Sequence, residues 1–135
     1  MGDPAGVGPE VLLKSYKKAR EIHNLVAISD FDKIKSLAER YDVPLRKINH
    51  IDEAENFKNQ LNILSLNYPR DFSPGEFDVE NAASVIESIQ IGTELCLKKK
   101  VSAMVTGPIN KSILKRKGFK FSGHTDYLES LCECE

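Results

Sequence analysis

Short apolar runs alternate along the chain with segments whose apolar residues recur at helical spacing. Continuous apolar runs at 25–28, 61–66 and 101–105 predict strands that are covered on both faces of a sheet, and 45–48 predicts a further short strand. The segments between them predict amphipathic helices, because their apolar residues recur every three or four positions. This alternation is typical of an α/β fold with a substantially parallel sheet. The polar stretch 49–60 gives no clear prediction.

Residues that favour the ends of helices locate most of the five predicted helices. A proline costs little in the first helical turn, and an aspartate side chain caps the free N–H groups there. Helices are therefore predicted to begin at Pro9, after Asp30 and after Asp78. The first is predicted to run to about His23, and Pro44 ends the second.

The helix after Asp78 is the longest, and its apolar face predicts part of the core. That face carries Ala82, Val85, Ile86, Ile89 and Cys96. A short helix is predicted over 109–117, where Gly118 is a natural residue to end it. The last predicted helix follows Gly123 and contains Tyr127, Leu128 and Leu131.

Composition and charge narrow the class of protein. The 135 residues are 41% hydrophobic and 29% charged, as in one soluble globular unit or a piece of one. The net charge of −1 gives no basic footprint for nucleic acid, and the run Lys98–Lys100 is interpreted as a solvated helix end. No apolar stretch approaches the roughly 20 residues that cross a bilayer. Three cysteines and no secretory signal predict a cytoplasmic location.

Two segments combine side chains that suit an anionic ligand. In Thr106–Lys111 a hydroxyl, a glycine backbone and a lysine amine follow the last predicted strand, where α/β sheets bind ligands. In Gly123–Asp126 the side chains of His124 and Thr125 stand together at a helix start, and both can donate hydrogen bonds to one ligand. Simpler interpretations remain open, with Lys111 as an exposed lysine and Thr125 as a helix cap.

The other candidate segments carry weaker signals. The loop Gly2–Glu10 either offers backbone N–H groups to an anion or forms a tight turn. It lacks the lysine of a Walker A loop and the third glycine of a dinucleotide fingerprint. His23 and His50 are predicted to lie on the surface, and Cys132 and Cys134 lack the spacing and further ligands of a metal site. No nucleophile and base can be paired for covalent catalysis.

Taken together, three motifs resemble the 4-hydroxythreonine-4-phosphate dehydrogenase family of vitamin B6 biosynthesis. They are Gly-Asp-Pro-Ala-Gly-x-Gly-Pro-Glu at Gly2–Glu10, Thr-Gly-Pro-x-x-Lys at Thr106–Lys111, and Gly-His-Thr-Glu/Asp at Gly123–Asp126. Each motif alone is weak, but their shared order and spacing are highly specific. The stretch 48–77 adds little to the resemblance.

The resemblance implies an isocitrate/isopropylmalate-dehydrogenase-like three-layer α/β/α fold, present only in part, and a homodimer at full length. It implies NAD-dependent oxidation and decarboxylation of 4-phosphooxy-L-threonine to 3-amino-2-oxopropyl phosphate, assisted by a divalent metal such as zinc, magnesium or cobalt. His124 and Thr125 inherit contacts to this substrate, and Lys111 is a further candidate. The family's three metal-binding histidines come later in the chain, so their counterparts are expected beyond Glu135.

On this interpretation residues 1–135 are the N-terminal portion of a single dehydrogenase chain. The chain is expected to be truncated at both ends and inactive alone, because it lacks the metal site and a strand before the glycine-rich loop. Three alternatives stay open. They are a paralogous dehydrogenase of erythronate or threonate 4-phosphate, an acyl-phosphate transferase of related fold, and a non-catalytic phosphate-binding domain.

Overall fold

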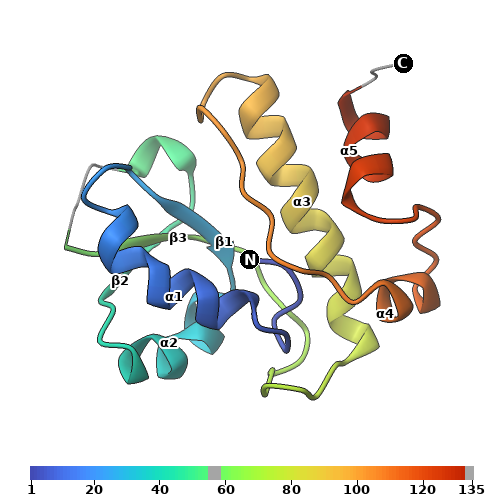
Figure 1. Ribbon diagram of the computed structural model, residues 1–135, viewed down its shortest axis with the longest axis horizontal. Coiled ribbons are helices and arrows are strands. Elements are labelled where there is room, and N and C mark those ends of the chain that lie inside the picture. The colour runs from blue at the N-terminus through green and yellow to red at the C-terminus, as the bar shows by residue number, and fades with distance from the viewer. Residues whose placement is uncertain (55–58, 133–135) are drawn as a thin grey trace.

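A computed structural model describes residues 1–54 and 59–132 and shows a small parallel sheet between layers of helices (Figure 1). The α/β fold with a parallel sheet predicted from the sequence is confirmed. The helices are α1 Gly8–Ala19, α2 Phe31–Arg40, α3 Ala82–Leu97, α4 Lys111–Arg116 and α5 His124–Cys132. The strands are β1 Val26–Ser29, β2 Leu45–Ile48 and β3 Leu61–Ser65, and the 3₁₀ turns are η1 Ile51–Glu53 and η2 Val79–Asn81.

The sheet has the strand order β1-β3-β2, and both pairings are parallel. The first four residues of β3 are buried, as expected of a central strand that helices cover on both faces. Ser29 and Ser65 are aligned at the carboxyl edge of the sheet. The Ser29 hydroxyl donates a hydrogen bond to the Met1 sulfur over 3.3 Å, so the N-terminal loop lies at this edge, where α/β folds bind ligands.

Helices α1 and α2 cover one face of the sheet and enclose the first core cluster. Its buried members are Leu13, Tyr16, Ala27, Ala38, Val43, Leu61 and Ile63. Helix α2 begins as predicted, because the Asp30 carboxylate accepts hydrogen bonds from the backbone N–H groups of Asp32 (3.1 Å) and Lys33 (3.2 Å). Helix α1 ends at Ala19, before the predicted end near His23.

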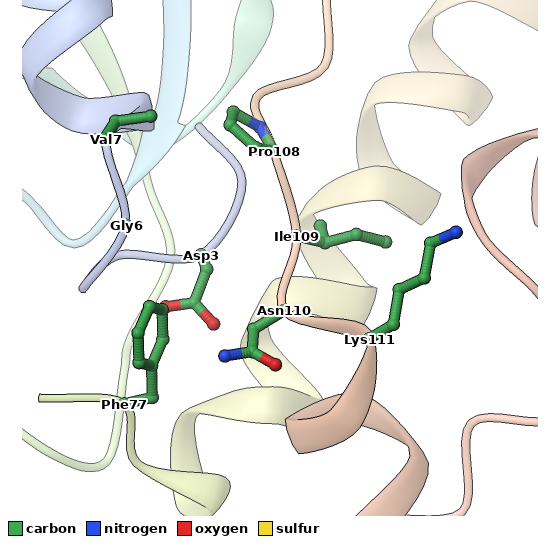
Figure 2. Close-up of a pocket in the computed structure, with 8 residues that line it drawn as sticks. All are labelled: Asp3, Gly6, Val7, Phe77, Pro108, Ile109, Asn110 and Lys111. Atoms are coloured by element: carbon green, nitrogen blue, oxygen red, sulfur yellow. The ribbon is translucent and has the colours of Figure 1, made fainter. Parts of the chain in front are cut away.

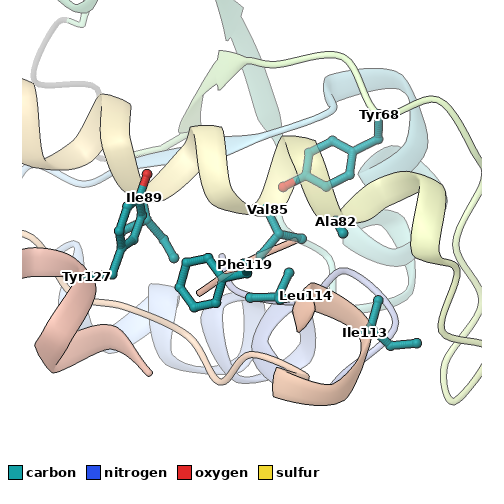
Figure 3. Close-up of a cluster of buried hydrophobic side chains, with 8 residues drawn as sticks. All are labelled: Tyr68, Ala82, Val85, Ile89, Ile113, Leu114, Phe119 and Tyr127. Atoms are coloured by element: carbon teal, nitrogen blue, oxygen red, sulfur yellow. The ribbon is translucent and has the colours of Figure 1, made fainter. Parts of the chain in front are cut away.

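Helix α3 lies against the sheet on one side and carries α4 and α5 on the other (Figure 1). The second core cluster surrounds α3 (Figure 3) and consists of Tyr68, Ala82, Val85, Ile89, Ile113, Leu114, Phe119 and Tyr127. The rings of Phe119 and Tyr127 meet edge to face with their centroids 5.2 Å apart. This cluster fixes α4 and α5, and therefore the residues at their first turns, against α3.

The predicted strand at 101–105 is wrong. Among the described residues no strand pairs with this segment, and Val105 is 92% exposed. The segment instead packs onto α3, since a Cβ added to Gly92 would lie only 2.4 Å from the Met104 sulfur. Apolar composition suggested a strand, but a strand also needs a neighbour for its backbone hydrogen bonds.

Two helix starts differ from the prediction. Asp78 caps the turn η2 through the Glu80 N–H at 2.8 Å, and α3 follows that turn. Helix α4 begins at Lys111 and not near Ile109, although Gly118 ends it with a φ of +87°, as predicted. Among the helices of the described chain, none combines the length and the apolar character needed to cross a membrane.

Candidate functional site

Two glycine-rich turns that are far apart in the sequence meet at the carboxyl edge of the sheet. The Asp3 N–H donates a hydrogen bond to the Pro108 carbonyl over 2.9 Å. A Cβ added to Gly107 would lie 2.1 Å from the Met1 carbonyl oxygen, and one added to Gly2 would lie 2.4 Å from the Pro108 oxygen. No side chain fits at either position, so the glycines allow the two backbones to touch. The structure thus joins the motifs Gly2–Glu10 and Thr106–Lys111.

A cavity of about 330 Å³ opens beside this contact (Figure 2). It is lined by Asp3, Gly6, Val7, Phe77, Pro108, Ile109, Asn110 and Lys111. Asp3 is only 6% exposed, and one of its carboxylate oxygens, Oδ1, accepts a hydrogen bond from the Ala5 N–H over 3.0 Å. Burial raises the pKa of Asp3, and the Ala5 hydrogen bond opposes that shift. The Asp3 carboxylate and the Asn110 amide point toward one another across the cavity (Figure 2).

Asn110 has a local role that holds the cavity wall in place. Its Oδ1 caps α4 by accepting a hydrogen bond from the Ile113 N–H at 3.3 Å, and it also accepts one from the Ser112 hydroxyl at 2.8 Å. The amide nitrogen makes no hydrogen bond to a described residue. It is therefore left as a donor that faces the cavity.

Lys111, the first residue of α4, connects the cavity to the histidine motif. Its side chain leads away from Asp3 and Asn110 (Figure 2). A Cβ added to Gly123 would lie 3.3 Å from the Lys111 ammonium nitrogen. The ammonium group therefore sits against the backbone that enters α5. Glycine at this position leaves room for the ammonium group.

His124 opens α5 and is half-buried beside this ammonium group. Desolvation lowers the pKa of the imidazole below its ordinary value, and the positive charge of Lys111 lowers it further. Both effects favour the neutral form of His124. Its Nε2 atom is buried and has no hydrogen-bond partner among the residues that the structure describes. A buried nitrogen without a partner is costly, and a ligand atom that bonds to it would remove that cost.

Thr125 is exposed in the first turn of α5, and its hydroxyl makes no hydrogen bond within the described chain. Asp126 instead fixes the start of the helix, because its carboxylate accepts from the Ser122 N–H at 3.2 Å and from the Ser122 hydroxyl. These hydrogen bonds lower the pKa of Asp126. The interpretation of Thr125 as a helix cap is wrong, and its hydroxyl is left to solvent or a ligand.

The structure brings Lys111 and His124 together, with Thr125 as the next residue along α5. Thr106 is exposed on the linking segment. Sequence reasoning singled out the motifs that contain Asp3 and Asn110 but assigned neither side chain to a site. Phe77 lies in the stretch 48–77, which gave no site prediction. For Asn110 the sequence does hold a local signal, because asparagine directly before a helix is a preferred N-cap.

The residues of this part of the chain do not fit the divalent metal that the resemblance implies. In the described ranges 1–54 and 59–132 there is no group of three or more His, Cys, Asp or Glu side chains that could hold a metal ion. His23 and His50 are exposed, as predicted. Cys134, one half of the Cys-x-Cys pair, lies outside the described residues.

Comparison with known proteins finds one consistent group of relatives. The model of the family described as pyridoxal phosphate biosynthetic protein PdxA matches residues 21–135. Curated 4-hydroxythreonine-4-phosphate dehydrogenases from Saccharophagus degradans and Maricaulis maris are 34% and 35% identical to the chain. The matches cover 93% and 98% of this chain but only 38% and 41% of the two relatives.

Solved structures give the same picture. The crystal structure of a 4-hydroxythreonine-4-phosphate dehydrogenase from Burkholderia phymatum matches with a TM-score of 0.87 and 28% identity, over 100% of this chain and 42% of that chain. The corresponding structure from Klebsiella pneumoniae matches with a TM-score of 0.86 and 28% identity, over 98% of this chain and 42% of that chain. The fold of the chain is thus a part of the fold of those proteins, as expected.

Proposed function

The chain belongs to the pyridoxal phosphate biosynthetic protein PdxA family, and we propose that it supplies part of the substrate site of an NAD-dependent 4-hydroxythreonine-4-phosphate dehydrogenase. The activity is assigned to the whole protein, because this chain spans about 40% of the length of its curated relatives. In the proposed reaction the secondary alcohol of 4-phosphooxy-L-threonine gives a hydride to NAD and a proton to solvent. The resulting β-keto acid loses carbon dioxide to yield 3-amino-2-oxopropyl phosphate.

The observation that carries the proposal is the meeting of Lys111 with the backbone at Gly123, next to His124. A lysine ammonium group supplies positive charge for a phosphate or carboxylate. A neutral imidazole with an unpartnered Nε2 can donate to, or accept from, a substrate oxygen. The exposed hydroxyl of Thr125 adds a second hydrogen-bonding group at the same helix start. Three groups of these types suit a small phosphorylated hydroxy acid.

The cofactors belong to the proposal for the whole protein and not to a site in this chain. A divalent metal would polarise the alcohol and ketone oxygens, and its ligands would come from residues beyond Glu135. The Gly2–Glu10 loop lacks the third glycine of a dinucleotide fingerprint, so no NAD contact is assigned to it. The proposal includes a homodimer at full length and a cytoplasmic location, which ultracentrifugation and cell fractionation would test.

Calorimetric titration of the protein with 4-phosphooxy-L-threonine tests the substrate site. Lys111→Met should weaken binding about ten- to a hundredfold, since it removes a charged partner of the ligand. Lys115→Met is the matched control, because Lys115 is exposed at the last turn of the same helix. Equal affinities of the two variants would contradict the assignment of Lys111.

A substrate panel separates the proposal from its closest rivals. Turnover of 4-phosphooxy-L-threonine in preference to erythronate 4-phosphate and threonate 4-phosphate supports it, and the reverse preference identifies a paralogous dehydrogenase. Acyl transfer to coenzyme A without NAD reduction would identify a transferase. Weak, metal-independent binding without turnover, abolished by His124→Ala, would identify a phosphate-binding domain.

A further inference from the structure

We propose that the cavity between the N-terminal loop and the first residue of α4 binds a primary ammonium group, with the Asp3 carboxylate as its anchor. The inference rests on the proposed function in one respect, because it assigns the cavity to the amino group of the hydroxy-amino-acid substrate. Lys111 and His124 would then hold the anionic end of the same ligand.

The Asp3 carboxylate is buried and only partly hydrogen-bonded. Its side chain is buried, with 6% exposure, and only Oδ1 is engaged, by the Ala5 N–H. Its second oxygen has no hydrogen-bond donor among the described residues, and no described lysine, arginine or histidine forms an ion pair with it. This second oxygen is not among the fully buried atoms that lack a partner, so it is open to the cavity. In a residue that is otherwise buried, a carboxylate charge is only partly compensated by water, and a cationic partner is favourable. An ammonium group in the cavity would supply both the missing charge and the missing donor.

The cavity walls add an aromatic ring and an amide donor beside this carboxylate. Phe77 lies beside the Asp3 carboxylate and is 42% exposed (Figure 2). An aromatic ring next to a carboxylate favours an organic cation, because a ring can attract positive charge and also contact the attached carbon atoms. The Asn110 amide nitrogen faces the carboxylate across the cavity and offers a hydrogen to an oxygen. The combination suits an ammonium group whose neighbouring carbon carries an oxygen.

Other ligands fit the cavity less well. A metal ion needs several ligands. Among the residues that the structure describes, Asp3 is the only carboxylate that lines this cavity, and Asn110 Oδ1 is already used to cap α4. An anion would be repelled by Asp3. The Lys111 ammonium group points out of the cavity toward Gly123. The Asp3 carboxylate therefore faces the cavity, while the Lys111 ammonium group lies outside it. A ligand that reaches both groups would carry both signs of charge.

The test compares two ligands that differ at one group. The protein is titrated calorimetrically with 4-phosphooxy-L-threonine and with the threonate 4-phosphate of the same configuration, which carries a hydroxyl in place of the ammonium group. We expect the ammonium ligand to bind about ten- to a hundredfold more tightly, the usual effect of a charged hydrogen bond. Asp3→Asn should abolish this preference, because it keeps the oxygen that accepts from Ala5 and removes only the charge. An equal loss for both ligands would overturn the proposal.

Two further variants test whether the preference for the ammonium ligand is specific to Asp3 and depends on the ring of Phe77. Glu129→Gln removes a carboxylate from the exposed face of α5 and should leave both affinities unchanged. Phe77→Leu keeps the wall apolar but removes the ring, and should weaken the ammonium ligand about two- to fivefold. A loss of the preference in Glu129→Gln would show that the effect is not specific to Asp3, and would overturn the assignment.

A second measurement separates this inference from the proposed function. If neither phosphorylated ligand binds, the proposed substrate is wrong, and the cavity is then probed with ethylammonium chloride by NMR. Shifts of the Asn110 side-chain amide that disappear in Asp3→Asn support the ammonium site without the proposed function. No shift with ethylammonium, or a shift with magnesium chloride alone, would overturn it.

Discussion

Replacing Gly107 with alanine tests whether the two glycine-rich turns hold each other by direct backbone contact. The added methyl group would lie 2.1 Å from the Met1 oxygen and 2.7 Å from the Met1 carbonyl carbon. Neither atom belongs to a flexible side chain, so the N-terminal loop must move away. That movement would also break the hydrogen bond from the Asp3 N–H to the Pro108 oxygen.

The magnitude follows from two contributions. Overpacking of a tight contact costs about 1–3 kcal/mol, and the lost hydrogen bond costs about 0.5–1.5 kcal/mol. Gly107→Ala should therefore lower the free energy of unfolding by about 2–4 kcal/mol. Gly118→Ala is the control, because its site has a φ of +87° but no atom within 4 Å of the added carbon. It should cost about 1 kcal/mol through backbone strain alone.

Urea unfolding followed by circular dichroism measures both values, and amide exchange of Asp3 reports the local contact. In Gly107→Ala the Asp3 amide should exchange faster than in the parent protein, whereas in Gly118→Ala it should not. The reasoning would be refuted by a Gly107→Ala protein that is as stable as Gly118→Ala and retains the protection of the Asp3 amide.

Three further predictions concern the histidine, a buried cap and the chain as a whole. NMR titration should show His124 losing its proton below its ordinary pKa of about 6.5, and Lys111→Met should raise that pKa. Because the folded pKa lies below the unfolded one, the unfolded chain takes up a proton first and stability should fall as the pH drops below about 6.5. Asp30→Ala should lower the unfolding free energy by about 2–4 kcal/mol, measured by urea denaturation, since it removes the α2 cap and leaves the Tyr68 N–H, now bonded at 3.0 Å, without an acceptor. The purified 135-residue chain should produce no NADH from 4-phosphooxy-L-threonine with added metal, and metal-dependent NADH production would contradict this.

Short stretches of sequence were enough to predict helix ends that depend on one residue and strands that are continuous apolar runs. Asp30 caps α2, Gly118 ends α4, and the strands near 25–28, 45–48 and 61–66 are present. These features depend on side-chain capping, backbone conformation and apolar runs, which are visible in a short stretch. The strand prediction for 101–105 was wrong, because strand pairing depends on a neighbouring strand that a local sequence pattern does not specify.

The site was predictable in its residue types but not in its assembly. Lys111, His124 and Thr125 were chosen because of their motifs, and the contact of Lys111 with Gly123 was not foreseeable from spacing alone. The cavity between Asp3 and Asn110 was missed for the same reason. It forms only when the N-terminal loop meets the segment before α4, and that meeting is a property of the tertiary structure. The expected truncation at both ends stays a prediction.

If Lys111 and His124 bind one anionic ligand together, a double-mutant cycle will show it. Calorimetry would give the affinity of 4-phosphooxy-L-threonine for the parent protein, Lys111→Met, His124→Ala and the double variant. Groups that share one ligand should show a coupling energy of about 0.5–3 kcal/mol. We expect this coupling, with the double variant losing less affinity than the sum of the two single losses. Strictly additive losses, or full affinity in either single variant, would contradict it.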